Sequence, residues 1–344
     1  MKFFKLAIAL IMSCTFSSQA LNAQNVNVVV GNPVPQAQQV SIDQISHEPF
    51  NQLLQTFVNI KGQVNYGAWK NSANATRALD SYLTTLSSAN PQAQSTRANQ
   101  LAYWINAYNA LTIKGILREY PTTSIRNHTS ETGGYNIWKT LFLPVGNQHY
   151  NLDSIEHKVL RKMNEPRIHF AIVCASHSCP RLHMRAYIPQ HLEEQLTHNT
   201  QNFFANPENF RWDPASRTFH MSSIVQWFGS DFGATQADQL RYLSTYLPAN
   251  AQAAAQQNAG TIAFLPYSWN LNEIKGPLTQ GSGTNQQGSG TTTQGSGTVA
   301  PQQGSGTVAP QQGSGTVVPQ QGSGTVVPQQ GSGTVVPQSG SGTR

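Results

Sequence analysis

Hydrophobic positions recur at intervals of three and four residues along several stretches of the chain, a pattern that predicts amphipathic helices. The longest stretch covers about 96–120, and Pro121 ends it because proline removes a helical hydrogen bond. Shorter stretches predict helices over about 50–57 and 79–86, and a further helix after Pro189. We therefore expect helices to dominate the folded part of the chain.

Signals for strands are fewer and lie far apart. Short apolar runs at 141–145 and 262–265 are bounded by turn residues and predict strands. Residues 168–173 alternate in polarity, which predicts a buried strand that ends in a polar loop at 174–180. Many helices with a few separated strands indicate the α+β class, as a helix-rich single domain with a small sheet.

Two of the predicted helices carry polar residues with more than one interpretation. Asn106 and Asn109 lie inside the apolar run of the longest helix, where each either bridges backbone groups in the core or directs an amide into a site. Asp153 suits an N-cap, and Glu156 follows three residues later as in a capping box, for a helix that reaches about Met163.

The first 23 residues have the pattern of a secretory signal peptide. Two lysines precede a short apolar run, and small residues offer cleavage after Ala20 or Ala23. We expect an exported protein, periplasmic or secreted. In the alternative interpretation, Cys14 belongs to a lipoprotein box and becomes a lipid anchor. No later stretch approaches the 18 or so apolar residues of a membrane span, so we predict no integral membrane segment.

Composition divides the remaining chain into three parts. Residues 24–45 are rich in Gln, Asn, Pro and Val and predict a flexible spacer, and residues 46–274 predict the folded domain. Residues 281–344 repeat Gly-Ser-Gly-Thr and lack large apolar side chains, so they cannot offset the entropy of ordering, and we predict a disordered tail over 275–344. Such a tail suits a tether that contacts a cell surface or wall.

The charge balance excludes one class of partner. The formal net charge is +6, without a run of basic residues interleaved with aromatic ones. Proteins that bind nucleic acid usually present a clustered basic face, so we expect no nucleic-acid partner.

Four motifs resemble the domain-of-unknown-function 547 family and occur in that family's order. They are the segments Tyr-Trp-Ile-Asn-Ala-Tyr-Asn-Ala-Leu-Thr-Ile at 103–113, Leu-Asp-Ser-Ile-Glu-His at 152–157, Pro-Arg-Ile-His-Phe-Ala through Cys-Ala-Ser-His-Ser-Cys-Pro at 166–180, and Gln-Trp-Phe at 226–228. The resemblance spans about 50–272. Val173 departs from the asparagine expected before the first cysteine, which puts in doubt a role for that side chain. The family includes exported bacterial proteins and plant proteins, and the resemblance implies no settled reaction, cofactor or substrate.

Candidate chemistry centres on Cys174 and Cys179, the two cysteines left once the leader is removed. Both lie in the loop that follows the predicted strand, and such loops usually border a cleft. Pro180 favours the first position of a helix, which would make Cys179 an N-cap and lower its thiol pKa through the helix dipole.

Our leading hypothesis is nucleophilic catalysis, as a cysteine-dependent hydrolase or acyl transferase that acts on a peptide-like envelope substrate. One cysteine would attack a carbonyl carbon, a histidine would take the proton, and a third group would orient the imidazole. The candidates for these roles are Cys174, Cys179, His157, His169, Glu156 and Asn106. Each histidine also has a simpler interpretation as a core or solvated residue, and Glu156 as a helix cap.

Three alternatives stay open at this level. A Cys174–Cys179 disulfide would close the loop of a non-catalytic binding module. The two thiols could instead form a redox pair in which Cys179 attacks. Zinc is the one cofactor to consider, although we expect none, and its ligands would come from His169, Cys174, His177 and Cys179, with His183 nearby.

Overall fold

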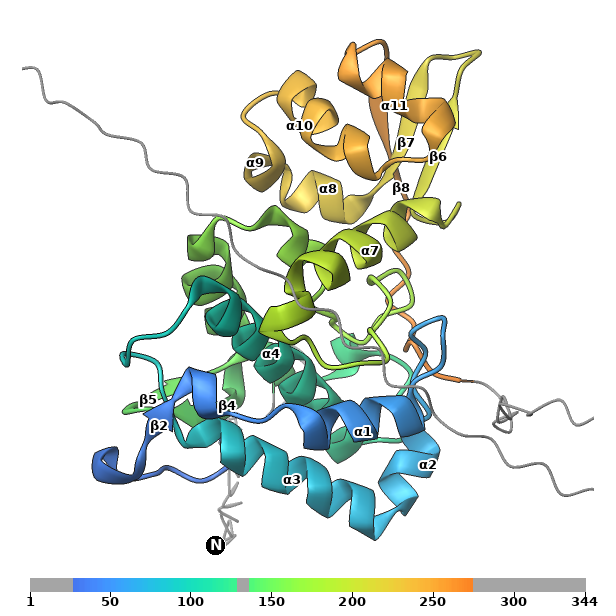
Figure 1. The fold of residues 1–344 in the computed structure, drawn as a ribbon. Helices are drawn as coiled ribbons and strands as arrows, with labels where there is room; N and C mark the ends of the chain where they lie inside the picture. Colours follow the sequence, from blue (N-terminus) through green and yellow to red (C-terminus); the bar gives the residue numbers. More distant parts are fainter. Residues whose placement is uncertain (1–26, 129–135, 275–344) are drawn as a thin grey trace, which may run out of the picture. The chain divides into compact units, whose positions relative to one another are not determined.

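The computed structural model describes residues 27–128 and 136–274 (Figure 1). Its α-helices are α1 (Glu48–Phe57), α2 (Tyr66–Asn71), α3 (Ala73–Ser87), α4 (Arg97–Glu119), α5 (Ile137–Thr140), α6 (Leu152–Ser154), α7 (Leu192–Ala205), α8 (Ser223–Trp227), α9 (Gly229–Phe232), α10 (Gln236–Leu243) and α11 (Ala249–Gln256). Helices dominate and the strands are short, so the predicted α+β class is confirmed. None of the described helices is both long and apolar enough to cross a bilayer.

Eight short strands in the described residues form three small sheets. The strands are β1 (Val28–Val29), β2 (Val40–Ser41), β3 (Ala89–Asn90), β4 (Leu141–Val145), β5 (Gln148–Tyr150), β6 (Phe210–Asp213), β7 (Thr218–Ser222) and β8 (Thr261–Leu265). The sheet orders are β1-β4-β5, β2-β3 and β6-β7-β8, and β7 pairs with β8 in parallel after a crossover through α8–α11. The predicted strands at 141–145 and 262–265 are thus confirmed as β4 and β8.

Helix α4 is the centre of the first of two hydrophobic cores. Every residue from Leu101 to Ile113 is buried, because neighbouring elements cover this helix on all sides. Helix α3 packs against α4 and α1 packs against α3, and both helices occur where the apolar spacing predicts them (Figure 1). Large aromatic side chains are completely buried in this core, among them Trp69, Tyr82 and Tyr103.

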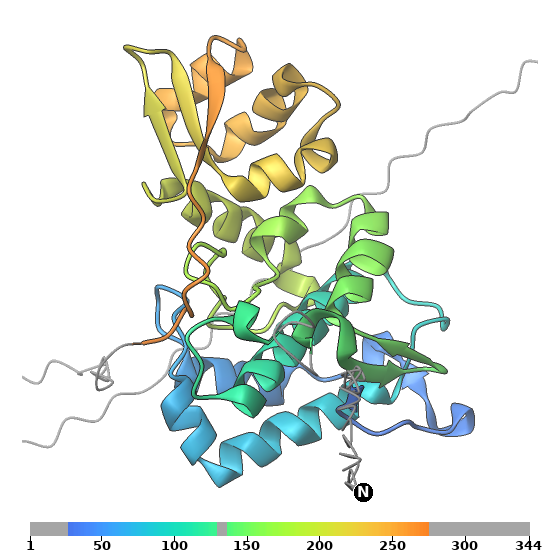
Figure 2. The ribbon, with the colours of Figure 1, turned by 180° about the vertical axis from the view of Figure 1, so that it is seen from behind.

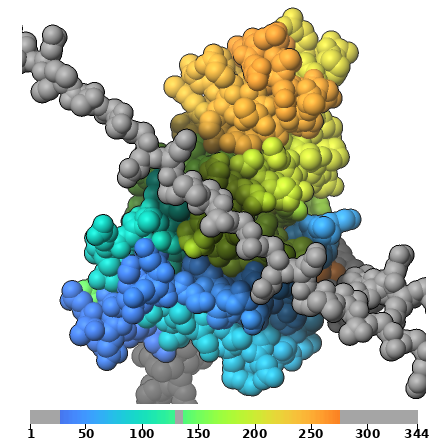
Figure 3. All heavy atoms as spheres, viewed as in Figure 1, coloured from blue at the N-terminus to red at the C-terminus, as the bar shows by residue number. Residues whose placement is uncertain are grey.

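A second core lies between the β6-β7-β8 sheet and helices α7–α11. It is built mainly from phenylalanines and leucines, among them Phe170, Phe204 and Phe219. In the space-filling view its residues, coloured yellow to orange, gather at the opposite end from the blue and cyan helices of the first core (Figure 3). The chain therefore has two packing centres within the described domain, and α7 lies where they meet.

The alternating segment 168–173 is not the predicted strand. Residues Pro166–Phe170 form a 3-10 helix, which Glu165 caps by accepting from the backbone of Arg167. The alternation has another cause: Ile168 packs in the first core and Phe170 in the second. Two different faces of this 3-10 helix are therefore buried, whereas in a strand residues 168 and 170 would share one face.

Two further expectations need correction. The N-cap at the helix after β5 is Asn151, with Ser154 completing the capping box, so neither Asp153 nor Glu156 caps it. Residues 27–45 contain β1, β2 and two 3-10 turns, and β1 pairs with β4, so the described part of the predicted spacer is ordered on the domain. The predicted leader at 1–23 and the predicted tail at 275–344 lie outside the described residues.

Residues 266–274, which we call the C-terminal strap, connect the two ends of the domain. They leave β8 and run in extended form past the loop of the cysteines towards α2 (Figure 2). Near its end the strap reaches Val64, where Ile274 donates to the Val64 carbonyl. The strap thereby places residues of the C-terminal region beside the first core.

Candidate functional site

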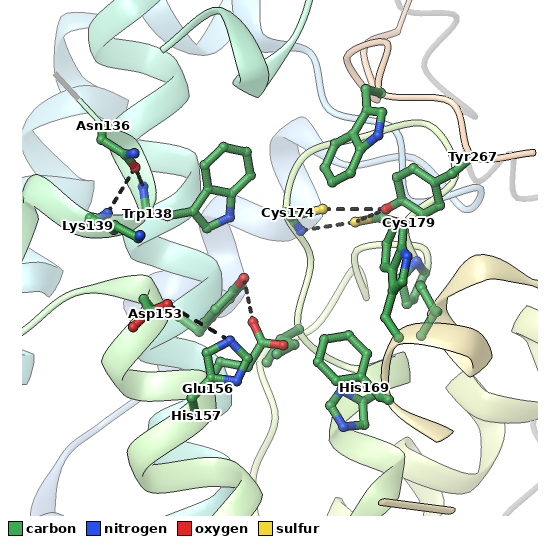
Figure 4. A pocket seen from close by; sticks show the side chains of 17 residues that line it. Asn136, Trp138, Lys139, Asp153, Glu156, His157, His169, Cys174, Cys179 and Tyr267 are labelled. Carbon is green, nitrogen blue, oxygen red and sulfur yellow. Dashed lines mark hydrogen bonds and ion pairs between the residues drawn. The ribbon is translucent and has the colours of Figure 1, made fainter. Parts of the chain in front are cut away.

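A cavity of about 310 Å³ opens at the place where the two cores meet (Figure 4). Its lining comes from α4, α5, the helical segment after α6, the cysteine loop, α8 and the C-terminal strap. Both cysteines line it, as do Glu156, His157 and His169. Five of the six residues predicted for catalysis therefore border one cavity, although they come from three separate segments.

Asn109 of α4 fixes the backbone that leads into the cysteine loop. Its amide donates to the Ala171 carbonyl at 3.0 Å and its carbonyl oxygen accepts from the Val173 backbone at 2.9 Å. Both contacts are buried, where an unpaired backbone group is costly. Of the two interpretations of this asparagine, the backbone bridge is the one that holds.

The C-terminal strap holds the other side of the loop. The backbone of His177 donates to Asn270 at 2.7 Å, and that of Asn272 donates to Ala175 at 3.0 Å. Ala175 has a φ of 58°, a left-handed conformation that non-glycine residues rarely adopt, and these flanking bonds hold it there. The loop is thus clamped between α4 and the strap.

The two thiols lie together and are not joined by a disulfide in this structure. The Cys179 sulfur accepts from the Cys174 backbone N–H at 3.1 Å and from the Tyr267 hydroxyl at 3.2 Å (Figure 4). The Cys174 thiol also hydrogen-bonds with Cys179. Ser176 completes the group, 2.7 Å from the Tyr267 oxygen and 3.3 Å from the Cys174 sulfur.

These donors change the ionisation of the pair. Burial raises the pKa of Cys179, but the hydrogen bonds from Cys174, Ser176 and Tyr267 outweigh burial and lower this pKa to about 6. The pKa of Cys174 moves well above its usual value, because Cys174 donates to its neighbour and is itself buried. Cys179 is therefore the thiolate of the pair at neutral pH.

The cause differs from the one expected from the sequence. No helix begins at Pro180, and residues 180–188 form no helix or strand. Hence no helix dipole acts on Cys179, and the lowered thiol pKa comes from local hydrogen bonds instead. The direction predicted for this thiol pKa agrees with the structure, whereas its predicted mechanism was wrong.

Glu156 brings a second unusual ionisable group to the cavity. It lies in a π-helix, Ile155–Leu160, a form that occurs often at functional sites. Burial raises the pKa of its carboxyl to about 7, and a hydrogen bond from Tyr108 at 3.3 Å opposes this shift. Close to neutrality this carboxyl exists in both forms, as a proton donor and acceptor must.

His169 is buried and held away from both thiols. Its Nε2 atom lies 2.8 Å from Asp231, which also forms a two-pronged ion pair with Arg161. The ring stacks on Phe228 with centroids 4.0 Å apart. Burial lowers the pKa of His169 to about 4, so the ring is neutral, and its Nδ1 has no hydrogen-bond partner among the described residues.

His157 stands at the rim of the cavity with 40% of its side chain exposed. It lies 3.3 Å from an Arg161 nitrogen and 3.9 Å from Asp153. None of its described contacts is with a cysteine. The structure therefore does not assemble the cysteine–histidine pair that the leading hypothesis requires from His157 or His169.

Asn106 is outside the cavity and belongs to the core. Its amide donates to the Tyr187 carbonyl at 2.7 Å, and its carbonyl oxygen accepts from the Tyr187 backbone at 2.9 Å. The donor and the acceptor of this side chain therefore both bind the backbone of one distant loop residue. Its predicted role in orienting a catalytic imidazole is wrong.

The alternative zinc ligands do not converge. His177 pairs with Glu208 at the surface, and His183 bonds to the backbone of Arg185. Across residues 27–128 and 136–274, no three histidine, cysteine or acidic side chains are placed to hold a metal ion. The fold therefore does not bring together the four ligands of the alternative zinc site, His169, Cys174, His177 and Cys179.

Tyr267 is the important residue that sequence reasoning missed. It stands 88 positions after Cys179, and neither residue type nor spacing connects the two. The cavity is also rich in aromatic side chains, from Trp138, Trp227, Phe228, Tyr267 and Trp269. Only the crossover through β8 and the strap brings these distant segments together.

The fold and the site define a helix-rich α+β domain with a paired-thiol site in an aromatic cavity. Residues 92–204 match the model of the family described as "Protein of unknown function, DUF547". This match confirms, over these residues, the family resemblance seen in the motifs. The match contains α4, the π-helix and the cysteine loop but ends before α8 and the strap. No curated protein and no solved structure matches the chain.

Proposed function

We propose that the protein is a cysteine-dependent acyl hydrolase or acyl transferase in which Cys179 is the nucleophile. The observation that carries the proposal is the set of donors aimed at the Cys179 sulfur in an accessible cavity. A thiolate is the reactive form of cysteine, and donors of this kind keep it ionised at neutral pH. The predicted export of the protein favours a peptide-like substrate of the cell envelope.

In the proposed reaction, the Cys179 thiolate attacks the carbonyl carbon of the acyl group and forms a tetrahedral oxyanion. Protonated Glu156 gives its proton to the leaving amine or alcohol as the bond to the carbonyl carbon breaks, and an acyl thioester remains. The Glu156 carboxylate then takes a proton from water, whose oxygen attacks the thioester and releases the acid. Cys179 leaves as the thiolate, and Glu156 is protonated again.

In this scheme Glu156, and not a histidine, donates and accepts the protons. The pKa of about 7 suits a group that must both donate and accept near neutrality. His169 is bound to Asp231, and His157 contacts Arg161 and Asp153. Tyr267 and Ser176 keep the thiolate ionised in the resting site, and in the proposed reaction their hydroxyls then donate to the oxyanion.

Acylation by p-nitrophenyl acetate tests this proposal. The reduced wild-type protein should release a burst of p-nitrophenol and gain one acetyl group, which peptide mapping should locate on Cys179. Cys179→Ser should abolish the burst, whereas Cys174→Ser should keep an acylated Cys179. A burst that survives in Cys179→Ser, or an acetyl group on Cys174 alone, would exclude the proposed nucleophile.

The hydrogen bond between the two thiols favours one second candidate, dithiol–disulfide exchange. Here the Cys179 thiolate attacks a substrate disulfide, and Cys174 then attacks the mixed disulfide. Two electrons pass to the substrate, which leaves as two thiols, while the protein keeps a Cys174–Cys179 disulfide. Cys174→Ser separates the candidates: exchange stops at the mixed disulfide, whereas acyl hydrolysis continues.

A further inference from the structure

The cavity has one wall made of aromatic rings. Trp227 and Trp269 lie nearly parallel, at 22° with centroids 5.8 Å apart, and Tyr267 contacts both. From the facing side of the cavity, Trp138 meets Trp269 edge to face at 6.3 Å (Figure 4). Trp227 is 47% exposed, one of only a few large apolar side chains so exposed among the described residues. An exposed tryptophan at a cavity offers a flat apolar face to a ligand.

The opposite wall is polar. Asp153 and His157 are each about two-fifths exposed. His157 Nδ1 lies 3.3 Å from an Arg161 nitrogen, whereas its Nε2 and the Asp153 carboxylate are 3.9 Å apart and keep hydrogen-bonding capacity for a ligand. Lys139 lines the same side, beside the indole of Trp138 (Figure 4). The thiols and Glu156 lie between the two walls. A ligand that fills this cavity therefore meets stacked rings on one side and donors and acceptors on the other.

A pyranose ring matches this division. Its C–H groups form a flat apolar face that stacks on aromatic rings, whereas its hydroxyls project from the edge towards polar partners. An aromatic or aliphatic peptide side chain would stack on the ring wall but would form no hydrogen bond with Asp153 or His157, so it would gain less from the polar wall than a hydroxylated ring does. The polar wall thus selects the saccharide over an apolar side chain.

The size of the cavity limits the ligand to a small unit. Its 310 Å³ is at the lower end of the roughly 300–1,000 Å³ typical of small-molecule sites. We propose that the site binds one sugar ring that carries an acyl substituent, with the ring against Trp227 and the acyl carbonyl at Cys179. This inference rests on the proposed function, since it supplies the substrate class for that reaction.

The test uses N-acetylglucosamine as the probe and the full-length reduced protein with Cys179→Ser, which prevents turnover. Saturation-transfer NMR and tryptophan fluorescence titrations should show binding, with the largest transfer to the C–H groups of the sugar ring. Trp227→Ala in the same background should weaken binding about ten-fold, as expected for the loss of an aromatic contact. Phe264→Ala is the matched control, because Phe264 is 42% exposed but does not line the cavity.

N-Acetylphenylalanine amide provides the competing peptide probe. Tighter binding of this amide than of the sugar, with the same dependence on Trp227, would overturn the saccharide class in favour of an aromatic side chain. Failure of the sugar to bind while wild-type Cys179 is still acylated would also overturn it, and would leave the proposed function intact. A third outcome is that the sugar binds in a Trp227-dependent way while Cys179 of the wild-type protein resists acylation. This result would support the saccharide site and count against the proposed chemistry.

Discussion

Removing the Tyr267 hydroxyl should raise the pKa of Cys179. In Tyr267→Phe the sulfur loses the donor that lies 3.2 Å away, while the ring still packs against both Trp227 and Trp269. A hydrogen bond to a charged group contributes about 1.5–3 kcal/mol, and one pKa unit corresponds to about 1.4 kcal/mol. The thiol pKa should therefore rise by about one to two units, from about 6 to about 7–8.

Thiolate absorbance at 240 nm, followed as a function of pH in the reduced protein, measures this shift. The direction follows from the charge: the donor stabilises the anion, so its loss favours the protonated thiol and moves the titration to higher pH. Tyr150→Phe is the control, since the Tyr150 hydroxyl bonds to Gln148 at an exposed position. A Tyr267→Phe titration that coincides with the wild-type curve would refute the assignment of the thiolate.

Three other sets of variants test the remaining parts of the site. Burial raises the pKa of Glu156 from 4.5 to about 7, so the folded state loses stability as pH rises across that range and the buried carboxyl ionises. Thermal unfolding of Glu156→Gln should therefore show a free energy of unfolding up to about 3 kcal/mol higher than wild type at pH 8 and little changed at pH 4.5. Equal effects at the two pH values would contradict the raised pKa. Asn109→Ala and Asn106→Ala should each lower the free energy of unfolding by roughly 2–4 kcal/mol, since each leaves two buried backbone groups unpaired. Only Asn109→Ala should also slow the alkylation of Cys179, because Asn109 holds the backbone that leads into the cysteine loop. His157→Ala should leave that alkylation rate unchanged, and a large fall would restore the histidine as the base.

The local pattern of the chain predicted the elements in which apolar residues recur at helical spacing. Helix α4 shows this well, because apolar residues at every turn predict a central helix whatever surrounds it. The error at 168–173 has a definite physical origin: Ile168 and Phe170 are both apolar because they enter different cores, and this spacing of two is indistinguishable in the sequence from one buried face of a strand. Sequence periodicity reports which faces are buried and does not report the path of the backbone between them.

The sequence indicated which reactive side chains form the candidate site, but not which distant residues contact them. Cysteine pairs are conspicuous because few residue types are nucleophilic, so Cys174 and Cys179 stand out in the sequence. Their environment depends on Tyr267, which reaches them through the crossover from β7 to β8 and the strap. Asn106 shows the opposite case, since an amide in an apolar helix is equally consistent with a site and with a backbone brace.

Selective alkylation of the native protein tests the central claim most directly. The reduced wild-type chain should be treated with limiting iodoacetamide at pH 6.5 and mapped by peptide mass spectrometry, with the unfolded chain as the reference. We expect modification of Cys179 ahead of Cys174 and faster than in the unfolded chain, because only the folded site lowers this thiol pKa. Preferential modification of Cys174, or a native Cys179 that reacts no faster than the unfolded one, would contradict the account.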